Sequence, residues 1–334
     1  MRQKANLTID DIARDLGVSK TTVSRAISGK GRISTATRER VQSYIRECNY
    51  RPSAAAKSLA ESRTYNLALV LPRSFIQLDL PYIRKSLNAI CEEAFLRDYN
   101  ILLCLSIDDN PDVLLRTLDN RKVDGVILAR TVENDILVDI LNQRDIPFST
   151  IGSLPPQSSG SAVVEADHDQ ISGCRDFTKA FLSSGAGNVA VLGNDMHYIV
   201  NQSRLTGFRN AVEELRIPED QITMRTGLYT EIICAEAVNQ LLELGFRRFL
   251  AMDDGICLWI LQALREQGIS IPGDVQIGSL CDSDQLVSQN ISALSFDAAE
   301  LGGTACRELL RYLLGEEYQE KPRLGYQISM RSST

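Results

Sequence analysis

The chain has 334 residues, 44% of them hydrophobic, and carries a formal net charge of −7. This length leaves room for two or three domains with sizeable cores, and no apolar run approaches the roughly 18 residues of a membrane span. The first residues lack the apolar stretch of a signal peptide, and the eight cysteines form no Cys-x-x-Cys pair. We therefore expect a cytoplasmic protein with reduced cysteines, no metal site and no membrane contact.

The charges are distributed unevenly along the chain. Residues 1–62 contain 12 basic and 6 acidic residues, a balance of +6, whereas residues 63–334 have a balance of −13. A basic segment on an acidic body suits a polyanionic partner for the basic segment only. Contact with nucleic acid is therefore expected of the N-terminal segment and not of the remainder.

The segment from Leu7 to Tyr50 predicts a helix-turn-helix unit of three helices. Thr8 and Asp11 are placed to form an acidic capping box at the start of the first helix. Gly17 is expected to end that helix with a positive φ, and Ser19 to cap the second. Helical spacing predicts an apolar face for the first two helices, made of Ile9, Ile12, Ala13, Leu16, Val23 and Ile27.

A third helix is expected to start at Ser34, with Val41, Tyr44, Ile45 and Cys48 on one face. In a helix-turn-helix unit the exposed side of the second helix reads DNA. Short polar groups and cations on that side can reach phosphates or base edges. They are Lys20, Thr21, Thr22, Ser24 and Arg25. The alternative is that they are ordinary solvated residues on a small helical domain.

The next segment, residues 51–62, predicts a conditional helix. Pro52 and Ser53 can start a helix and the following alanines favour one, yet about nine residues with almost no apolar face are marginal alone in water. Leu59 is its one large apolar residue. Either Leu59 packs on its own domain within a linker, or two such helices pair in a dimer and insert Leu59 into the DNA minor groove.

These motifs resemble the LacI/GalR family of bacterial transcription regulators, and the resemblance covers essentially the whole chain. The motifs are T-I-D-D-I-A at 8–13, G-V-S at 17–19, T-V-S-R at 22–25, T-R-E-R-V at 37–41 and N-Y-R-P at 49–52, with Ala56 and Leu59. The resemblance implies that Lys20, Thr21 and Arg25 read the major groove. It also implies that Ala56 and Leu59 meet the minor groove at the centre of a pseudo-palindromic operator.

The DNA-binding set expected on these grounds comprises Thr8, Ser19, Lys20, Thr21, Thr22, Ser24, Arg25, Ser34, Tyr50, Ser53, Ala56, Lys57 and Leu59. One departure lies in the conditional helix, where many relatives have valine and this chain has Ala55. That change should weaken the mutual packing of two paired helices without abolishing it.

From Tyr65 onward, short β runs alternate with amphipathic helices, which predicts an α/β fold with parallel sheets. The expected strands are 67–71, 101–105, 125–128, 148–151, 189–192, 249–252 and 275–280. The expected helices are 83–96, 176–182, 205–215, 231–244 and 256–267. The phrases V-D-G-V-I at 123–127 and R-L-T-G-F at 204–208 match the periplasmic-binding-protein-like core of the family, which implies two lobes with crossed connections.

The expected organisation is therefore a helix-turn-helix domain at 1–52, a hinge helix or linker at 53–63 and an effector-binding core at 64–334. The Pro- and Ser-rich stretch at 155–161 is the best internal boundary by composition. The first lobe is expected at about 64–158 and 297–317, and the second at about 159–296 and 318–334.

Ligands of open α/β sheets bind beyond the carboxyl ends of the strands. Residues that follow the predicted strands are therefore candidates for contact with a small-molecule effector, and the resemblance adds the family's effector arginine, which maps onto Arg204. The candidates are Arg73, Phe75, Arg130, Arg204, Asp253 and Asp282. The alternatives are a surface cation or an interlobe ion pair for Arg204, and solvated loop cations for Arg73 and Arg130.

The chain departs from the family around this site. It has Cys281 where relatives often have an aspartate that grips sugar hydroxyls, Arg73 where they have an acid, and Ala186 where they have a histidine. One anion fewer and one cation more favour an anionic metabolite, such as a phosphorylated sugar or a sugar acid. A neutral sugar remains the alternative.

Nothing in the sequence favours catalysis. His168 and His197, the two histidines, lie in no nucleophile elbow, zinc-binding spacing or phosphate loop. We expect no catalytic residues and no cofactor. The prediction is a homodimeric repressor of transcription that binds double-stranded operator DNA under control of a small metabolite. The alternative is a cytoplasmic small-molecule-binding protein that has lost operator binding.

Overall fold

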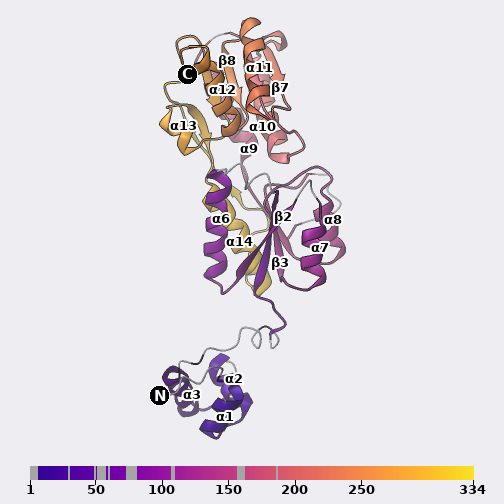
Figure 1. Cartoon of the computed structure of the whole chain (residues 1–334), viewed down its shortest axis with the longest axis vertical. Helices are drawn as coiled ribbons and strands as arrows, with labels where there is room; N and C mark the ends of the chain where they lie inside the picture. The colour runs from indigo at the N-terminus through magenta and orange to yellow at the C-terminus, as the bar shows by residue number, and fades with distance from the viewer. Residues whose placement is uncertain are drawn as a thin grey trace. The chain divides into compact units, whose positions relative to one another are not determined.

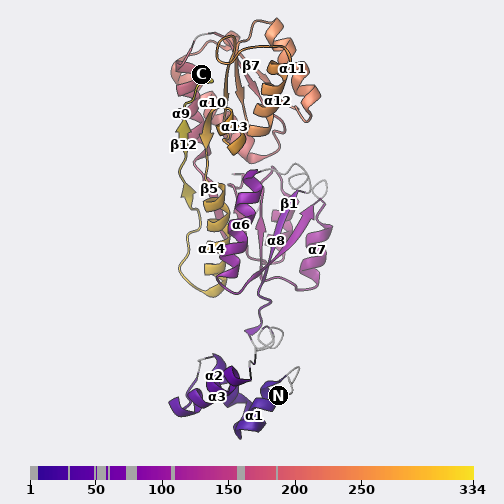
Figure 2. The same cartoon turned by 60° about the vertical axis from the view of Figure 1, so that its left-hand side comes forward.

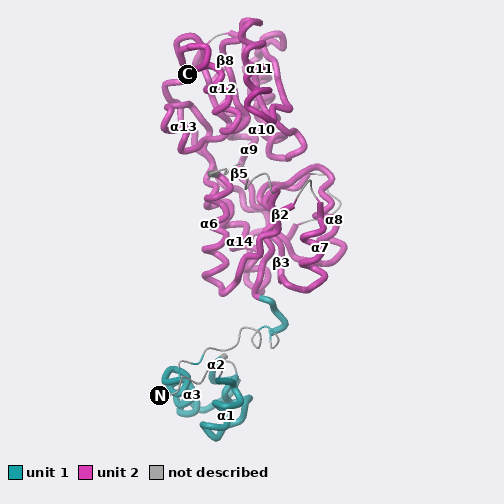
Figure 3. The backbone as a smooth tube through the Cα atoms, in the orientation of Figure 1, with its two compact units in different colours: residues 1–64 teal, residues 65–334 magenta. Residues whose placement is uncertain are grey.

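The computed structural model describes residues 7–28, 31–48, 50, 58, 61–72, 81–106, 110–155, 162–185 and 187–334. The chain divides into two compact units, residues 1–64 and residues 65–334, which Figure 3 shows in teal and magenta. Each unit has its own hydrophobic core, as expected of a domain.

The first unit contains the helices α1 (Ile9–Leu16), α2 (Lys20–Ser28) and α3 (Thr35–Glu47). Thr8 and Asp11 form a capping box at the start of α1, and Gly17 ends the helix with a φ of 62°. Ile12, Val23 and Val41, one from each helix, are fully buried in a common cluster. The predicted helix-turn-helix is confirmed.

One expectation for the third helix is wrong. Cys48 is exposed and forms the C-cap of α3 instead of lying on its buried face. Tyr44 and Ile45, on the same helix, do pack against the core of the unit. Helical spacing predicts which face a residue shares, but not how far along the helix the neighbouring helices cover that face.

The second unit contains two lobes, each built on a six-stranded sheet. The first sheet is parallel, with the order β11-β5-β4-β3-β1-β2. Its strands are β1 (Asn66–Pro72), β2 (Asn100–Ser106), β3 (Gly125–Leu128), β4 (Phe148–Ile151), β5 (Val164–His168) and β11 (Arg323–Leu324). Its helices are α6 (Pro81–Phe95), α7 (Asp112–Asp119), α8 (Ile136–Gln143) and α14 (Ala298–Leu314).

The helices cover both faces of this first sheet, with α6 and α14 on one side and α7 and α8 on the other (Figure 1). Alternate residues of β1 decide the arrangement. Leu67 and Leu69 pack with residues of α6 and α14, while Ala68 and Val70 pack with residues of α7 and α8. A strand buried on both faces has a continuous apolar sequence, so β1 could be predicted from its sequence.

The second sheet has the order β12-β10-β9-β8-β6-β7 and is parallel except for β12. Its strands are β6 (Val189–Leu192), β7 (Ile222–Arg225), β8 (Arg248–Ala251), β9 (Gln276–Ser279), β10 (Ser292–Ser295) and β12 (Gln327–Ser329). The helices of this lobe are α9 (Gln170–Ser183), α10 (Ile199–Leu215), α11 (Glu231–Glu243), α12 (Asp254–Glu266) and α13 (Asp284–Ser288), with a 3-10 turn η1 (Glu219–Gln221).

The chain crosses between the lobes three times, after β5, after β10 and after β11 (Figure 2). The crossed connections implied by the resemblance are therefore present, but two boundaries need correction. Residues 164–168 belong to the first lobe, because β5 pairs with β4, and residues 323–324 also belong to it, because β11 pairs with β5. The Pro- and Ser-rich stretch at 155–161 thus precedes a strand of the first lobe and is not the crossing itself.

Candidate functional site

The first two helices, α1 and α2, form the candidate nucleic-acid interface. Lys20, Thr21, Ser24 and Arg25 are exposed along α2, whereas Val23 and Ala26 on the same helix are buried. The αL conformation of Gly17 turns the chain between the two helices, so the polar side of α2 remains open while its apolar side packs on α1 and α3. This geometry is that of a recognition helix with its N-terminal residues accessible.

Three of the predicted DNA-contacting residues act as helix caps. The Thr8 hydroxyl accepts a hydrogen bond from the Asp11 amide at 3.2 Å. The Ser19 and Ser34 hydroxyls each accept one, at 3.1 Å, from the amide three residues further on. Thr22 is half-buried, and its hydroxyl shares a 2.8 Å hydrogen bond with Ser19. DNA contact by these four residues stays a prediction, since a cap can still expose its second lone pair to a phosphate.

An acidic partner of Lys20 was not predicted. The Lys20 ammonium lies 2.7 Å from the carboxylate of Asp10 on α1, and both side chains are largely exposed. An exposed pair of this kind contributes about 1 kcal/mol or less to stability, so a phosphate or a base edge can compete for the lysine. The neighbouring Asp11 is engaged in the capping box, which leaves Asp10 as the acid of α1 that faces α2.

Tyr50 is the last of the predicted DNA-contacting residues that the structure describes. It is half-buried against the core of the first unit, and burial raises the pKa of its hydroxyl. Ser53, Ala56, Lys57 and Leu59, the predicted minor-groove residues, lie outside the described residues.

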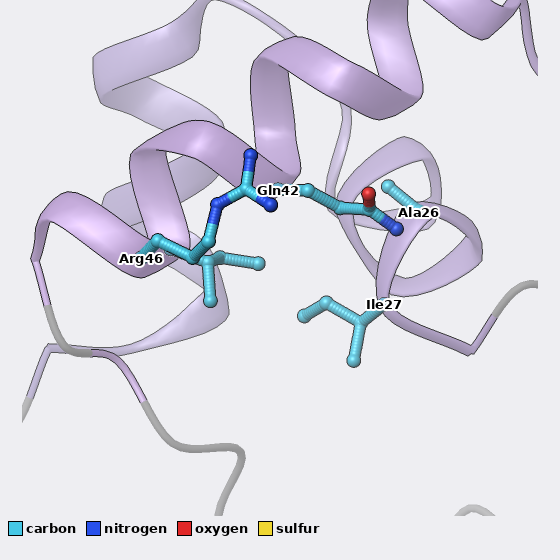
Figure 4. A pocket seen from close by; sticks show the side chains of 5 residues that line it. Ala26, Ile27, Gln42 and Arg46 are labelled. Atoms are coloured by element: carbon cyan, nitrogen blue, oxygen red, sulfur yellow. The ribbon is translucent and has the colours of Figure 1, made fainter.

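A small pocket lies between the end of α2 and α3 (Figure 4). Ala26 and Ile27 line it from α2, and Gln42, Ile45 and Arg46 from α3. Its volume of about 280 Å³ is slightly below the range of about 300–1,000 Å³ usual for sites that enclose drug-sized ligands. This pocket is therefore a poor candidate for the effector site.

Arg204, a predicted effector-binding residue, is a buried cation with no carboxylate in ion-pair range among the described residues. It is 8% exposed, and one terminal nitrogen donates a 2.9 Å hydrogen bond to the Met252 carbonyl directly after β8. Its Nε has no hydrogen-bond partner among the described residues. A guanidinium stays charged in a protein, and a buried donor without a partner is costly. The alternatives of a surface cation and an interlobe ion pair are therefore not what the structure shows.

Two thiols and a tyrosine lie close enough to Arg204 to interact with its charge. Burial raises the pKa of Cys174 and of Cys281 to about 12 in each case, and the Arg204 charge opposes the rise. Both thiols are therefore neutral at physiological pH. Tyr82, which belongs to α6 of the first lobe, also has a pKa raised mainly by burial and lowered by Arg204. Residues of both lobes thus lie within range of this cation.

Asp253 directly follows the Met252 carbonyl and is the N-cap of α12. Its carboxylate accepts a 2.8 Å hydrogen bond from the Ile256 amide. Burial raises the pKa of this carboxyl, while the hydrogen bonds it accepts and the charge of Arg204 act in the opposite direction. Asp254 also has a raised pKa, first through burial and then through the neighbouring Asp253. Contact of Asp253 with an effector stays a prediction.

Asp282 is held within the second lobe. Its carboxylate pairs with Arg331 at 2.5 Å and accepts a 2.8 Å hydrogen bond from the Ser295 hydroxyl. Arg331 was not predicted as its partner, because 49 residues separate the two in sequence. Contact of Asp282 with an effector stays a prediction and requires this ion pair to be shared or opened.

Arg130 is not the solvated loop cation that was one alternative for it. Its guanidinium pairs with Asp135 at 2.9 Å, and the side chains are only 5% and 3% exposed. Asp135 in turn caps α8 through the Leu137 amide. Arg130 is thus engaged in the structure of the first lobe. Arg73 and Phe75 lie outside the described residues.

The lobes meet at the carboxyl ends of their strands. After β3, the Thr131 carbonyl accepts a 3.1 Å hydrogen bond from the Ile199 amide at the start of α10, and Val132 forms a bridge with Tyr198. On α6, the Lys85 ammonium lies 3.1 Å from Asp284 of α13. The region predicted to bind the effector is therefore where the two lobes contact each other.

The cysteines of the described part of the chain lie mostly in the hydrophobic cores. Six cysteines are buried, in line with the expected core positions, while Cys48 and Cys91 are exposed. Within the described ranges, no group of three or more histidine, cysteine and acidic side chains is arranged to hold a metal ion. None of the helices in those same ranges combines the length and apolar character that a bilayer crossing requires.

Two family models match the chain. Residues 8–53 match the model described as "Bacterial regulatory proteins, lacI family", and residues 178–334 match the model of a periplasmic binding protein-like domain. The HTH-type transcriptional regulator DegA of Bacillus subtilis is 32% identical over 277 residues, covering 81% of this chain and 80% of that protein. Catabolite control protein A of Priestia megaterium is 26% identical over 98% of this chain and 99% of its own.

Solved structures share the fold over nearly the whole chain. The lac repressor dimer bound to operator and the anti-inducer ONPF has a TM-score of 0.78 at 20% identity, covering 98% of this chain and 99% of that one. The complex of the transcriptional regulator CelR with cellobiose has a TM-score of 0.72 at 23% identity, covering 98% and 100%. At these identities the likeness concerns the fold alone.

Proposed function

The chain belongs to the LacI family of bacterial transcriptional regulators, with a periplasmic-binding-protein-like effector domain, and from this premise we propose that it is a ligand-controlled repressor. Proteins of this family, which are regulators and not enzymes, bind DNA operators and effectors. In our proposal a homodimer in the bacterial cytoplasm binds a pseudo-palindromic operator, and a small metabolite bound between the lobes changes its affinity for that operator.

The observation that carries the proposal is the exposed polar side of α2 on a basic segment. Lys20 and Arg25 project from a helix whose other side is buried, and residues 1–62 carry a balance of +6 against −13 for the rest. Duplex DNA attracts such a surface through its phosphates, while the acidic core is repelled. Ser53, Ala56, Lys57 and Leu59 belong to the proposal as minor-groove contacts on the strength of the family resemblance.

Exposed apolar side chains support the homodimer. In the second lobe Tyr229 and Ile232, near the start of α11, are 62% and 72% exposed. In the first lobe Phe95 and Leu96, at the end of α6, are 79% and 73% exposed. Apolar side chains that gather at the surface often mark an interface between protein chains. A dimer would place two α2 helices on half-sites about one helical turn, or a multiple of it, apart.

The residues around Arg204 support an anionic effector. The Nε of Arg204 has no hydrogen-bond partner among the described residues, the thiol of Cys281 is neutral, and Asp282 is already paired with Arg331. A phosphate or carboxylate accepts hydrogen bonds from an arginine in a fork geometry. A phosphorylated sugar or a sugar acid is therefore the first candidate. A neutral sugar is the second, because the solved CelR structure, which shares the fold, contains cellobiose.

Selection of bound fragments from a random pool of duplex DNA tests the proposal. The wild type should enrich a pseudo-palindromic sequence, and Lys20→Ala/Arg25→Ala should lose that enrichment. A matched control variant, Lys122→Ala/Arg209→Ala, removes two exposed cations from the surface of the second unit. It should select the same sequence as the wild type. If the wild type enriches no sequence, the alternative of a metabolite-binding protein without operator binding is favoured.

A thermal-shift screen tests the effector class. We expect sugar phosphates or sugar acids to raise the melting temperature and the corresponding neutral sugars to leave it unchanged. Stabilisation by neutral sugars alone would overturn the preference for an anion.

A further inference from the structure

The three crossings between the lobes meet around one buried histidine. His168 is the last residue of β5 and begins the first crossing. It pairs in register with Leu324, the last residue of β11, where the third crossing begins. Its ring lies 4.9 Å, centroid to centroid, from the ring of Phe296 in the second crossing. His168 therefore lies at the start of the first crossing, beside the second through its ring and beside the third through strand pairing, and all three segments must bend when the lobes change their angle.

The His168 ring is enclosed without the polar contacts that a buried imidazole usually has. The residue is 2% exposed, and neither Nδ1 nor Nε2 has a hydrogen bond of ordinary geometry to any described residue. The polar groups that interact with the ring are the backbones of Gly325 and Asp297, one in the third crossing and one in the second. Buried polar atoms normally find a partner, so this exception calls for an explanation.

The charges that face His168 come from two of the three segments. Asp167 on β5 and Asp297 at the start of α14 both favour the imidazolium, and Asp167 is itself paired with Arg323 of β11 at 3.1 Å. Burial acts in the opposite direction and is the larger effect, so the pKa of His168 lies below its ordinary value. The ring is neutral at neutral pH in this arrangement of the lobes.

We propose that His168 is a positioning residue that holds the three crossings together as a neutral ring, and that its protonation shifts the lobes towards an arrangement in which the crossings admit water. The imidazolium has two N–H donors, and no described residue accepts from either of them in ordinary hydrogen-bond geometry, so the enclosed charged ring is poorly solvated. Because the lobe arrangement is expected to govern operator affinity, DNA binding would then respond to acidification independently of any metabolite. This role of His168 goes beyond the proposed function as a regulator and can be tested without DNA.

The direction of the effect follows from the lowered pKa. Well above pH 6.5, the ordinary pKa of histidine, the ring is predominantly neutral in both arrangements, so pH has little influence through this group. As the pH falls below that value, the more hydrated arrangement binds the proton first and gains population. Each unit by which the pKa values of the two arrangements differ corresponds to a tenfold change in their ratio at low pH.

The full chain offers a direct measurement, because Lys85 and Asp284 face each other across the two lobes. Spin labels at Lys85→Cys and Asp284→Cys, with the exposed Cys48 and Cys91 changed to serine, would report the distance between the lobes. Histidine-specific NMR of the same protein would follow both rings, since the chain has only two histidines. His197 is exposed, and His197→Gln would assign its signal and set it apart from that of His168.

We expect the His168 signal to titrate below the ordinary pKa of histidine, and the population of label distances to shift with the His168 midpoint between pH 7.5 and 5. His168→Asn and His168→Phe should abolish this shift, and His197→Gln should retain it. Distances that do not change while His168 titrates, or a shift that persists in either His168 variant, would overturn the proposal. If both His168 variants fail to fold, the wild type still tests the proposal: the pH midpoint of the distance shift must coincide with the NMR midpoint of His168. Absence of DNA binding by the wild type would refute the regulator proposal and leave this test intact.

Discussion

At the scale of single residues, the ion pair between Arg130 and Asp135 lies in the interior of the first lobe. Arg130→Ala removes the cation and leaves the Asp135 carboxylate buried beside the start of α8. We expect the free energy of unfolding to fall by about 3–5 kcal/mol, because an uncompensated buried charge costs that much. Chemical denaturation monitored by circular dichroism measures the change.

A matched control for this prediction is Arg144→Ala. Arg144 pairs with Asp119 at 2.6 Å, but the two side chains are 39% and 61% exposed. The expected loss is below about 1 kcal/mol, since solvent screens an exposed pair. Equal losses for the two variants would show that the Arg130 pair is not buried as described.

Arg204 allows a second prediction at the same scale. Arg204→Ala should abolish the thermal shift caused by whichever compound of a metabolite panel stabilises the wild type, because the donors of the buried guanidinium are lost. Affinity for the selected duplex without metabolite should stay within about threefold, well under the tenfold that corresponds to 1.4 kcal/mol. Arg209→Ala, on the same helix α10 and exposed, is the control and should keep the shift. A normal shift in Arg204→Ala would exclude the ligand role.

Single residues also show where prediction from the sequence ends. Thr8, Asp11 and Gly17 could be assigned correctly because a cap and a turn depend on neighbours within three residues. The partner of Asp282 lies 49 residues away and that of Lys20 lies on another helix, so no local pattern indicates either of them. Candidate residues could therefore be identified from strand ends, helix faces and the family resemblance, while their charge partners required the tertiary structure.

At the scale of elements, the contact between α6 and α14 depends on close approach of the two helices. A Cβ at Gly302 would lie 2.6 Å from the Ser86 carbonyl oxygen, whereas a Cβ at the adjacent Gly303 would meet Ala89 at an ordinary 3.7 Å. Gly302→Ala should therefore lower the free energy of unfolding by about 1–3 kcal/mol through overpacking. Denaturant titration of the purified variant tests this.

Gly303→Ala is the control on the same helix. Without a steric conflict, alanine should leave stability unchanged or raise it by up to about 1 kcal/mol, because glycine is the poorer helix former. A larger loss for Gly303→Ala than for Gly302→Ala would contradict the helix contact described here.

Three of the strands that were not predicted have a common physical cause. Apolar runs such as β1, β3 and β6 were predicted because both faces of these strands are buried. The strand β5 reads Val-Glu-Ala-Asp-His, which does not resemble a buried strand. Its acids are buried because Lys321 and Arg323 pair with them from the returning chain. The short β11 and β12 depend in the same way on partners that the sequence does not place beside them.

At the scale of the whole molecule, a cationic segment and an acidic core have separate roles. The family, the helix-turn-helix and the two lobes with largely parallel sheets were all predicted from the sequence, since they rest on motifs, periodicity and the family resemblance. The point at which the chain changes lobes was not, because the boundary depends on pairing of β5 with β4 and not on loop composition.

The salt dependence of duplex binding by the full chain tests the central claim most directly. For the sequence selected from the random pool, the account predicts that the logarithm of the association constant falls linearly with the logarithm of salt concentration. Between 50 and 200 mM salt the loss should be about a thousandfold or more, as for proteins that neutralise six or more phosphates. The slope should be smaller for Lys20→Ala/Arg25→Ala and unchanged for Lys122→Ala/Arg209→Ala. Affinity that is independent of salt, or that depends on the core cations instead, would contradict the account.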